Sequence, residues 1–433
     1  MVDWGKISDV CRKYMEKRSG KSRTVFPYYA LHDVPHLENV RHLGRELYLS
    51  LGPASLRKYA FYEAFWACSA YTHDLGMAVG PRELDALGLH TSALENYLKT
   101  SAEGALANKL GKFGSFFANY GNGKSFLEWG RVKIPENVKV GDPAFADFLR
   151  VIHPWVSYEL AKRELAEELR DLFKDRGQAT EYVKHVGLVA LLHWRYAPLD
   201  LQAAVFEGYE IDFRLWGAVI KLADALDATE DRATRTLGYI RDVLKNDISQ
   251  AAHRAFKILR KVRDVSYAES GVKITYDKLV LDVGPGRENA ELLGFLLFEV
   301  GGNIYEDYKT AAEVLQAGYG IRLPPLWIRA GDREVELQPY LPQLRNAFKR
   351  LEDIKLEDSP YLEELRKSGA PEEYVEMLKP AKDPQTGKTR EYNPLDALAV
   401  AVLTQTPTHG IIRLILRDLN STEVEKLLKT LTR

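Results

Sequence analysis

Apolar residues recur every three or four positions along the first part of the chain. Residues 3–18 show this pattern, and a second stretch beginning near His36 repeats it at Leu37, Val40, Leu43, Leu47 and Leu51. Because this spacing places apolar side chains on one face, both segments are predicted to be amphipathic helices. The stretch 61–77, FYEAFWACSAYTHDLGM, is instead apolar on every face. A helix of that kind belongs inside a core, and we expect it to end at Gly76.

Further helices are predicted between residues 145 and 237. In the stretch 151–173, Pro154 suits the first helical position, which places His153 at the N-cap. The segment 181–201 carries an apolar run that ends at His193. The stretch 213–237 predicts a helix with three ionisable side chains on one face, Lys221, Asp224 and Asp227. Apolar neighbours surround Asp224, and since an unpaired carboxylate is disfavoured there, we expect it to have a partner.

The pattern changes after residue 240. Residues 251–264 are predicted to form a basic amphipathic helix, and 265–286 alternate in a way that predicts a two-stranded hairpin or small sheet. Helical spacing then returns, and LPPLWI at 323–328 indicates a boundary. We expect a mainly α fold with three parts: a metal-binding helical domain at 1–240 with an insertion at about 78–148, a helix, small β element and helix packing on it at 241–328, and a helical C-terminal module of unknown role at 329–433.

Charge and cysteine content exclude several classes of protein. The 433 residues include 60 basic and 61 acidic side chains, so no global field favours long nucleic acid or an anionic membrane. The two cysteines are Cys11 and Cys68, and because Cys68 lies in the apolar stretch 61–77 we expect no disulfide framework. The sequence has no apolar run of the roughly 18 residues that a membrane span needs, and its first residues lack the basic-then-apolar order expected of a signal peptide. We therefore expect a cytoplasmic protein with no membrane partner.

The candidate chemistry begins at the inner end of the apolar stretch, where His73 and Asp74 are adjacent. Burying an imidazole and a carboxylate is costly unless they are paired or bind a metal. An isolated pair is explained most simply as a helix cap beside a solvated carboxylate. Six ionisable groups, however, stand at inner helix ends or on apolar faces: His36, His73, Asp74, His153, His193 and Asp224. They come from five predicted helices, as in the metal sites of helical bundles, and could hold two divalent ions with one carboxylate bridging them.

The order of these groups resembles that of the HD-domain metal-dependent phosphohydrolases. The matching motifs are HLENV from His36, THDLG from Thr72 and KLADALDATEDR from Lys221, and the resemblance covers roughly residues 20–235. It implies a helical bundle whose first metal is held by four residues, His36, His73, Asp74 and Asp224. His153 and His193 occupy the places of two further histidines, which hold a second metal in the dinuclear members. In mononuclear nucleotidases of this superfamily such residues have substrate or acid–base roles.

The resemblance implies a hydrolase. One or two divalent transition metal ions (Mn, Fe, Ni, Co or Zn) would activate water to attack a phosphate ester or phosphodiester of a small, nucleotide-like substrate. Four residues are the expected catalytic groups: Asp74, His153, His193 and Lys221. Lys221 would neutralise substrate phosphate, and an ion pair with Asp224 or Asp227 is the alternative for it. The sequence contains no GYP signature, so a cyclic dinucleotide substrate is not supported.

Two other functions stay open at this point. An HD-type nuclease acting on single-stranded nucleic acid could use the basic run at 254–263, although such a run is more often a solvated helix face. A non-catalytic HD module that binds a regulatory partner is the third hypothesis. The glycine-rich segment 111–125 ends in Gly123-Lys124-Ser125, but Ala118 stands where a phosphate loop requires glycine, so a nucleotide loop is not expected. The sequence leaves open whether this segment gates the site and whether the protein forms a homo-oligomer.

Overall fold

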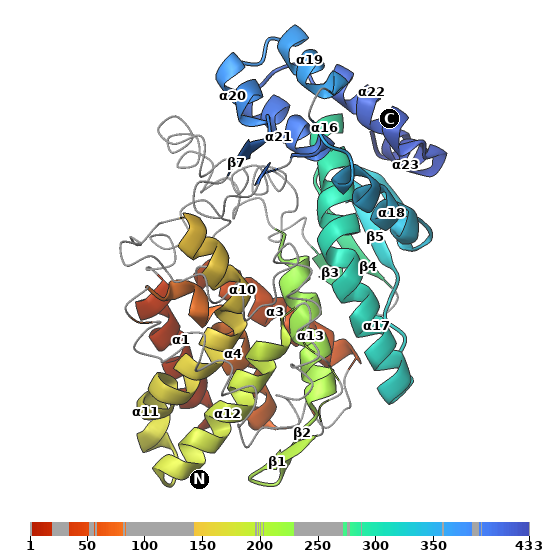
Figure 1. Cartoon of the computed structure of the whole chain (residues 1–433). Coiled ribbons are helices and arrows are strands. Elements are labelled where there is room, and N and C mark those ends of the chain that lie inside the picture. Colours follow the sequence, from red (N-terminus) through yellow and green to blue (C-terminus); the bar gives the residue numbers. More distant parts are fainter. Residues whose placement is uncertain are drawn as a thin grey trace. The chain divides into compact units, whose positions relative to one another are not determined.

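The computed structural model shows a mainly helical chain over the residues that it describes (Figure 1). The described residues are 2–19, 34–51, 59–80, 143–194, 203–228, 272–274, 278–286, 288–356, 359–382, 389–390 and 392–432, with a few isolated residues between them. They divide into two compact units. The first is drawn from Met1–Phe26, His32–Asp224 and Thr310–Arg322, and the second from Pro27–Leu31, Ala225–Lys309 and Leu323–Arg433.

The first unit is a bundle of helices with one short hairpin. Its helical elements are α1 (Trp4–Ser19), α3 (Val34–Leu51), α4 (Ala60–Thr72), η2 (Leu75–Ala78), α10 (Pro143–Leu160), η3 (Ala161–Leu165), α11 (Ala166–Leu169), η4 (Arg170–Leu172), α12 (Arg176–Leu192) and α13 (Phe213–Leu226), whose last residues belong to the second unit. Strands β1 (Ala204–Phe206) and β2 (Tyr209–Ile211) form the hairpin. The sequence analysis predicted the helices of this region but not the hairpin.

Helix α4 is the centre of the first unit. It packs against α1, α3 and α12, and every residue from Phe61 to Thr72 except Glu63 is buried. Aromatic rings fill the space around its start, where the ring of Phe61 stacks on that of Tyr209 at 4.3 Å between centroids and lies edge-on to Trp4 at 5.0 Å. Such pairs stabilise a core beyond their buried area. The prediction of a buried helix within 61–77 is confirmed, but α4 ends at Thr72 and not at Gly76 as expected.

Two local predictions for the first unit are wrong. Cys11 of α1 and Cys68 of α4 form a disulfide, with their Cα atoms 5.5 Å apart, although we expected none. The error arose because the apolar setting of Cys68 was taken as evidence against pairing, whereas α1 buries its own cysteine against the same face of α4. Pro154 lies inside α10 instead of beginning it, since the helix starts at Pro143. A proline in a helix interior removes one backbone hydrogen bond, and this helix accommodates that loss.

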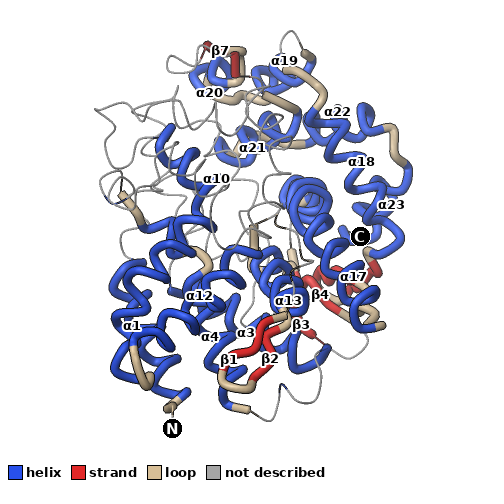
Figure 2. The backbone as a smooth tube through the Cα atoms, turned by 60° about the horizontal axis from the view of Figure 1, so that its bottom comes forward, coloured by secondary structure: helices blue, strands red, loops and turns tan. Residues whose placement is uncertain are grey.

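The second unit combines a four-stranded sheet with helices (Figure 2). Strands β3 (Val272–Ile274), β4 (Leu279–Asp282), β5 (Leu326–Ala330) and β6 (Arg333–Glu336) lie in that order, and only the β4–β5 pair of this sheet is parallel. The connection between β4 and β5 contains α16 (Asn289–Gly294), η5 (Phe295–Ile304) and α17 (Tyr305–Tyr319), whose C-terminal part belongs to the first unit. Parallel strands require a long connection of this kind.

The rest of the second unit is mainly helical. It comprises η6 (Gln338–Tyr340), α18 (Leu341–Glu352), α19 (Pro360–Lys367), α20 (Glu372–Met377), the pair β7 (Ala381–Lys382) and β8 (Thr389–Arg390), α21 (Pro394–Thr404), α22 (His409–Leu419) and α23 (Thr422–Thr432). Helix α18 packs closely on η5, where a Cβ on Gly301 would lie only 2.5 Å from the backbone oxygen of Leu344. The backbones can approach this closely because Gly301 has no side chain.

The mainly α fold class with small β elements is confirmed, as is the hairpin β3–β4. Strands β5 and β6 were not predicted, because the two prolines of LPPLWI were taken as a boundary when they directly precede β5. The pairing of β4 with β5 joins residues on both sides of that position. The three-part division of the chain stays a prediction.

Some predicted features lie outside the described residues. They are nearly all of the insertion at 78–148, its glycine-rich segment, and the basic helix at 251–264. Within the described part of the chain, the helices are all too short or too polar to cross a membrane.

Candidate metal centre

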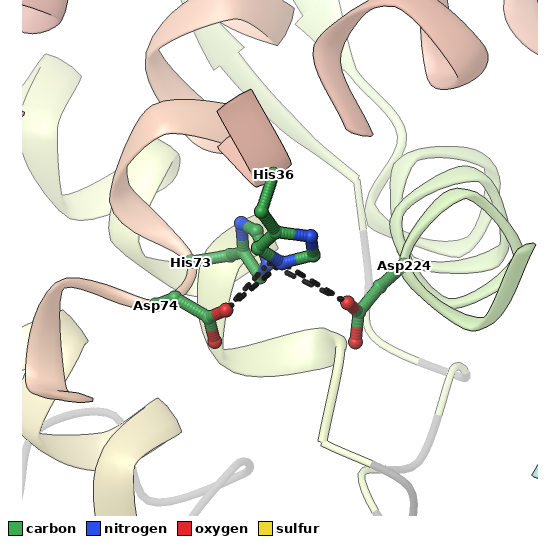
Figure 3. Close-up of side chains that lie close together, drawn as sticks. All are labelled: His36, His73, Asp74 and Asp224. Atoms are coloured by element: carbon green, nitrogen blue, oxygen red, sulfur yellow. Dashed lines mark hydrogen bonds and ion pairs between the residues drawn. The ribbon is translucent and has the colours of Figure 1, made fainter. Parts of the chain in front are cut away.

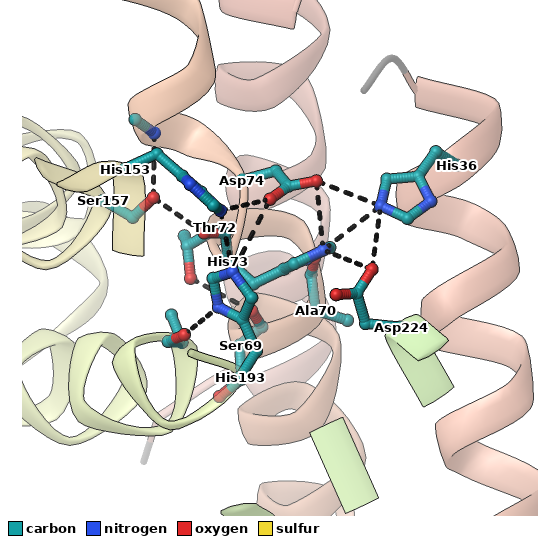
Figure 4. Close-up of polar contacts among 12 residues, drawn as sticks. His36, Ser69, Ala70, Thr72, His73, Asp74, His153, Ser157, His193 and Asp224 are labelled. Carbon is teal, nitrogen blue, oxygen red and sulfur yellow. Dashed lines mark hydrogen bonds and ion pairs between the residues drawn. The ribbon is translucent and has the colours of Figure 1, made fainter. Parts of the chain in front are cut away.

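The six predicted ligand residues lie together in the first unit (Figures 3 and 4). Five elements bring them there. His36 is in the first turn of α3, Asp224 is in the last turn of α13, and His73 and Asp74 form the turn that joins α4 to η2. His153 lies in the middle of α10, and His193 is the C-cap residue of α12.

His36, His73, Asp74 and Asp224 form the first ligand group (Figure 3). The Nε2 atom of His36 lies 3.0 Å from Oδ2 of Asp74 and 3.5 Å from Oδ1 of Asp224. The Nε2 atom of His73 lies 3.3 Å and 3.7 Å from the same two oxygens. Two imidazole nitrogens and two carboxylate oxygens thus converge on one point, which is the donor set that divalent transition metals accept.

Asp74, His153 and His193 form the second ligand group (Figure 4). Here the other oxygen of Asp74, Oδ1, lies 3.2 Å from Nε2 of His153 and 3.8 Å from Nε2 of His193. The two histidine Nε2 atoms are 2.9 Å apart. Asp74 therefore presents one oxygen to each group, which is the arrangement of a bridging carboxylate.

Backbone carbonyls fix the orientation of one histidine in each group. Nδ1 of His73 donates to the carbonyl oxygen of Ala70 at 2.7 Å, and Nδ1 of His193 donates to that of Ala190. A histidine whose Nδ1 carries the proton offers the lone pair of Nε2 to a metal. In both residues it is Nε2 that faces Asp74.

The charges of the first group perturb its pKa values strongly. Burial lowers the pKa of His73, but the neighbouring Asp74 and Asp224 outweigh it and raise that pKa to about 10. Burial raises the pKa of Asp224, but the hydrogen bond and charge of His73 and the charge of His36 prevail, so this pKa lies well below its usual range. The first group without metal thus holds a proton on His73, at the place where a cation is favoured.

The second group is electrostatically different. Burial, followed by the charges of His73 and His153, lowers the pKa of His193 to about 3. His193 is therefore neutral at physiological pH, and its Nε2 lone pair is available without losing a proton.

The side chains of the cluster differ in their exposure to solvent. The side chains of Asp224 and His153 are 31% and 13% exposed, whereas His36, His73 and Asp74 are at most 3% exposed. Asp224 and His153 are therefore the most solvent-exposed members of the cluster.

Lys221 lies close to this centre but outside both ligand groups. Its side chain is buried, and Nζ donates to the backbone carbonyl of Trp194, the residue after His193. The contact joins α13, which carries Asp224, to the end of α12.

Ser157 was not among the predicted site residues. This buried residue of α10 contacts the backbone of the His73–Gly76 turn with its hydroxyl (Figure 4). Its position four residues after His153 was the only available signal, and a serine in a helix is too common for that spacing to single it out.

A helical bundle that gathers His, His-Asp and Asp in this way is an HD-like domain with a cluster able to hold a divalent metal. The family model described as HD-CE matches residues 26–282, which is more than half of the chain and includes all six residues, and the chain belongs to that family. Neither the curated proteins nor the solved structures include a match to it. The HD-like domain and its His/Asp cluster together suggest a metal-dependent hydrolase.

Proposed function

We propose that this protein is a metal-dependent phosphohydrolase with a two-metal centre, acting on a phosphate ester or phosphodiester of a nucleotide-like substrate. The observation that carries the proposal is the position of Asp74, whose Oδ2 lies 3.0 Å from His36 and whose Oδ1 lies 3.2 Å from His153. A carboxylate shared by two histidine groups is how a protein places two ions a few ångströms apart, and such pairs serve phosphoryl chemistry.

Each ligand group would hold one ion. His36, His73, Asp74 and Asp224 would hold the first, and Asp74, His153 and His193 the second. When bound, such an ion lowers the pKa of its water from about 15.7 to about 7 and so supplies hydroxide at neutral pH. The mixture of imidazole and carboxylate donors suits Mn, Fe, Ni, Co or Zn.

The exposed side of the centre suggests where the substrate binds. His153 is the partly exposed histidine of the second group, so its imidazole is within reach of a substrate that enters there. If the protein binds a single ion, His153 is instead placed to give a proton to the leaving oxygen. His193 is more deeply buried, and its lowered pKa makes it a poor proton donor.

The role of Lys221 follows from its burial. The predicted role was neutralisation of substrate phosphate, and it stays a prediction. A side chain that is 1% exposed and donates to the carbonyl of Trp194 is better placed to hold the turn carrying His193. We therefore propose that Lys221 supports the second ligand group.

The number of ions bound per chain tests the assignment of these residues to two ligand groups. Purified protein analysed by mass spectrometry for metals is expected to hold two ions per chain, and His193→Ala one. His185→Ala is the matched control, because His185 lies on the same helix α12 but in neither ligand group, and it should keep both ions. Protein that binds no divalent ion after reconstitution would exclude the proposed function.

A substrate panel then identifies the reaction. Nucleoside phosphates, cyclic nucleotides and short single-stranded oligonucleotides would be tested with each of the five metals. Hydrolysis of the small nucleotides is the expected result. Selective cleavage of oligonucleotides that weakens with added salt would favour the nuclease, and binding of metal without any hydrolysis would favour a regulatory module.

A further inference from the structure

The hydroxyl of Ser157 makes two hydrogen bonds to the turn that carries His73 and Asp74 (Figure 4). Oγ donates to the carbonyl oxygen of His73 at 2.7 Å and accepts from the backbone N–H of Gly76 at 2.8 Å. The side chain is fully buried. One hydroxyl thus satisfies two buried backbone groups on either side of Asp74, and leaving such groups unsatisfied would cost free energy.

Ser157 shares a helix face with His153. The two residues are four positions apart on α10, so their side chains lie one above the other. One of them contacts Oδ1 of Asp74, and the other contacts the backbone that carries Asp74. The same helix face therefore supplies a ligand and fixes the distance from that ligand to the bridging carboxylate.

Gly76 allows this approach. A Cβ at residue 76 would collide with the backbone oxygen of His153 and lie 2.9 Å from Cβ of Val156. The turn and α10 are therefore in backbone contact just beside the ligand. A glycine with no room for a side chain and a serine with two backbone bonds together hold α10 against the turn.

The two ligand groups depend on this contact unequally. Ser157 bonds to the turn that carries His73 and Asp74, but this turn also continues α4 directly, and His36 and Asp224 reach the first group from α3 and α13. His153 reaches the second group from α10 itself. A displacement of α10 would consequently change the distance between Asp74 and His153 and leave the first group in place.

We propose that Ser157 is a positioning residue that sets the spacing between Asp74 and His153, and through it the affinity of the second metal position. The inference rests on the two-metal function proposed above. Groups that orient metal ligands in this way change metal affinity by about 10–100-fold when they are removed.

The test compares Ser157→Ala with Ser69→Ala by titrating metal-free protein with Mn²⁺ in a calorimeter. Ser69 is an equally buried serine whose hydroxyl donates only within α4, to the carbonyl of Phe65 at 2.9 Å, so its removal breaks no contact between elements. We expect the second Mn²⁺ to bind about 10–100-fold more weakly to Ser157→Ala, with the first changed less than about threefold. Ser69→Ala should match the wild type in both steps.

Three outcomes would count against the proposals, and they are distinguishable. Equal weakening of both steps in Ser157→Ala, with a lowered melting temperature, would mean a general structural role and overturn the inference. Identical titrations for the two serine variants would do the same. A wild-type protein that binds one equivalent or none would overturn the two-metal function together with the inference.

A second variant guards against failure of Ser157→Ala to fold. Ser157→Cys keeps a group of similar shape, but a thiol is a weak donor and acceptor. The second Mn²⁺ should bind to it with an affinity between those of the wild type and the alanine variant. An affinity equal to that of the wild type would show that the two hydrogen bonds do not matter.

Discussion

The two halves of the metal centre share Asp74 but differ in charge. The first group contains two carboxylates, and without metal its His73 holds a proton because its pKa is raised to about 10. The second group has only the shared carboxylate, and the pKa of His193 is lowered to about 3. Without metal, His73 of the first group is therefore protonated at neutral pH, whereas His193 of the second group is not. The comparison teaches that the two positions should bind divalent ions with unequal affinity, the first more tightly.

The largest expected effect comes from removing the shared residue. Asp74→Asn withdraws a charged oxygen from each half, so both ions and all hydrolysis above background should be lost. Metal analysis and activity assays measure this. Asp282→Asn, which changes a buried carboxylate of the second unit outside both groups, should retain both. Retention of one ion by Asp74→Asn would show that the halves do not share this carboxylate.

Stepwise removal of metal should separate the two halves. A unit charge about 4 Å away contributes on the order of 4 kcal/mol at an effective dielectric constant of about 20, so the additional carboxylate of the first group should hold its ion at least about tenfold more tightly. Dialysis against increasing chelator is expected to remove one equivalent before the other. The equivalent lost first should be the one missing from His193→Ala. Simultaneous loss of both ions would show that the two ligand groups do not differ in their affinity for metal.

Gly76→Ala tests the contact between the turn and α10. The added methyl group would collide with the backbone of His153, and overpacking of this kind costs about 1–3 kcal/mol. Thermal or denaturant unfolding of the metal-free protein should show that loss. Gly5→Ala is the control, because its Cβ would meet only Asp3 at an ordinary 3.5 Å, and a stability equal to that of Gly5→Ala would contradict the prediction.

The pH dependence of metal binding should give the smallest effect, and it tests whether the two ligand groups release different numbers of protons. An ion entering the first group must displace the proton of His73, so its affinity should rise about tenfold per pH unit while the pH is below about 10. His193 is already neutral above its pKa of about 3 and releases no proton in that range. Titrations at pH values one unit apart, in buffers of different ionisation enthalpy, measure the protons released. Proton release confined to the second binding step would contradict the expectation that the first ion enters the group that contains His73.

The sequence allowed much of the centre to be predicted because each ligand stands at a recognisable place. His73 and Asp74 end an apolar helix, and Asp224 lies among apolar neighbours, so burial and partnering followed from local pattern alone. His153 was predicted from its order in the chain and from an expected N-cap position before Pro154, and the second ground was wrong because the helix around it starts at Pro143.

The rest could not be predicted because it depends on contacts between distant segments. The hydroxyl of Ser157 bonds to the backbone of residues 73 and 76, and no periodicity in the sequence predicts that contact. The same applies to Cys11 and Cys68, whose pairing requires α1 and α4 to be adjacent. Strand β5 was not predicted because two prolines precede it. Its pairing partner β4 could not indicate it either, because a helical connection separates the two strands in the sequence.

The distribution of the six ligands over five elements has a consequence for folding. Apart from the adjacent His73 and Asp74, these side chains are far apart in the unfolded chain, so it has no preformed site, and divalent ions should bind the native state almost exclusively. Mass action then makes the melting temperature a function of free metal concentration, with a gain of about 2.7 kcal/mol at a concentration 100 times the dissociation constant. Metal binding should therefore stabilise the folded first unit, and it can occur only after α3, α10, α12 and α13 have assembled around α4.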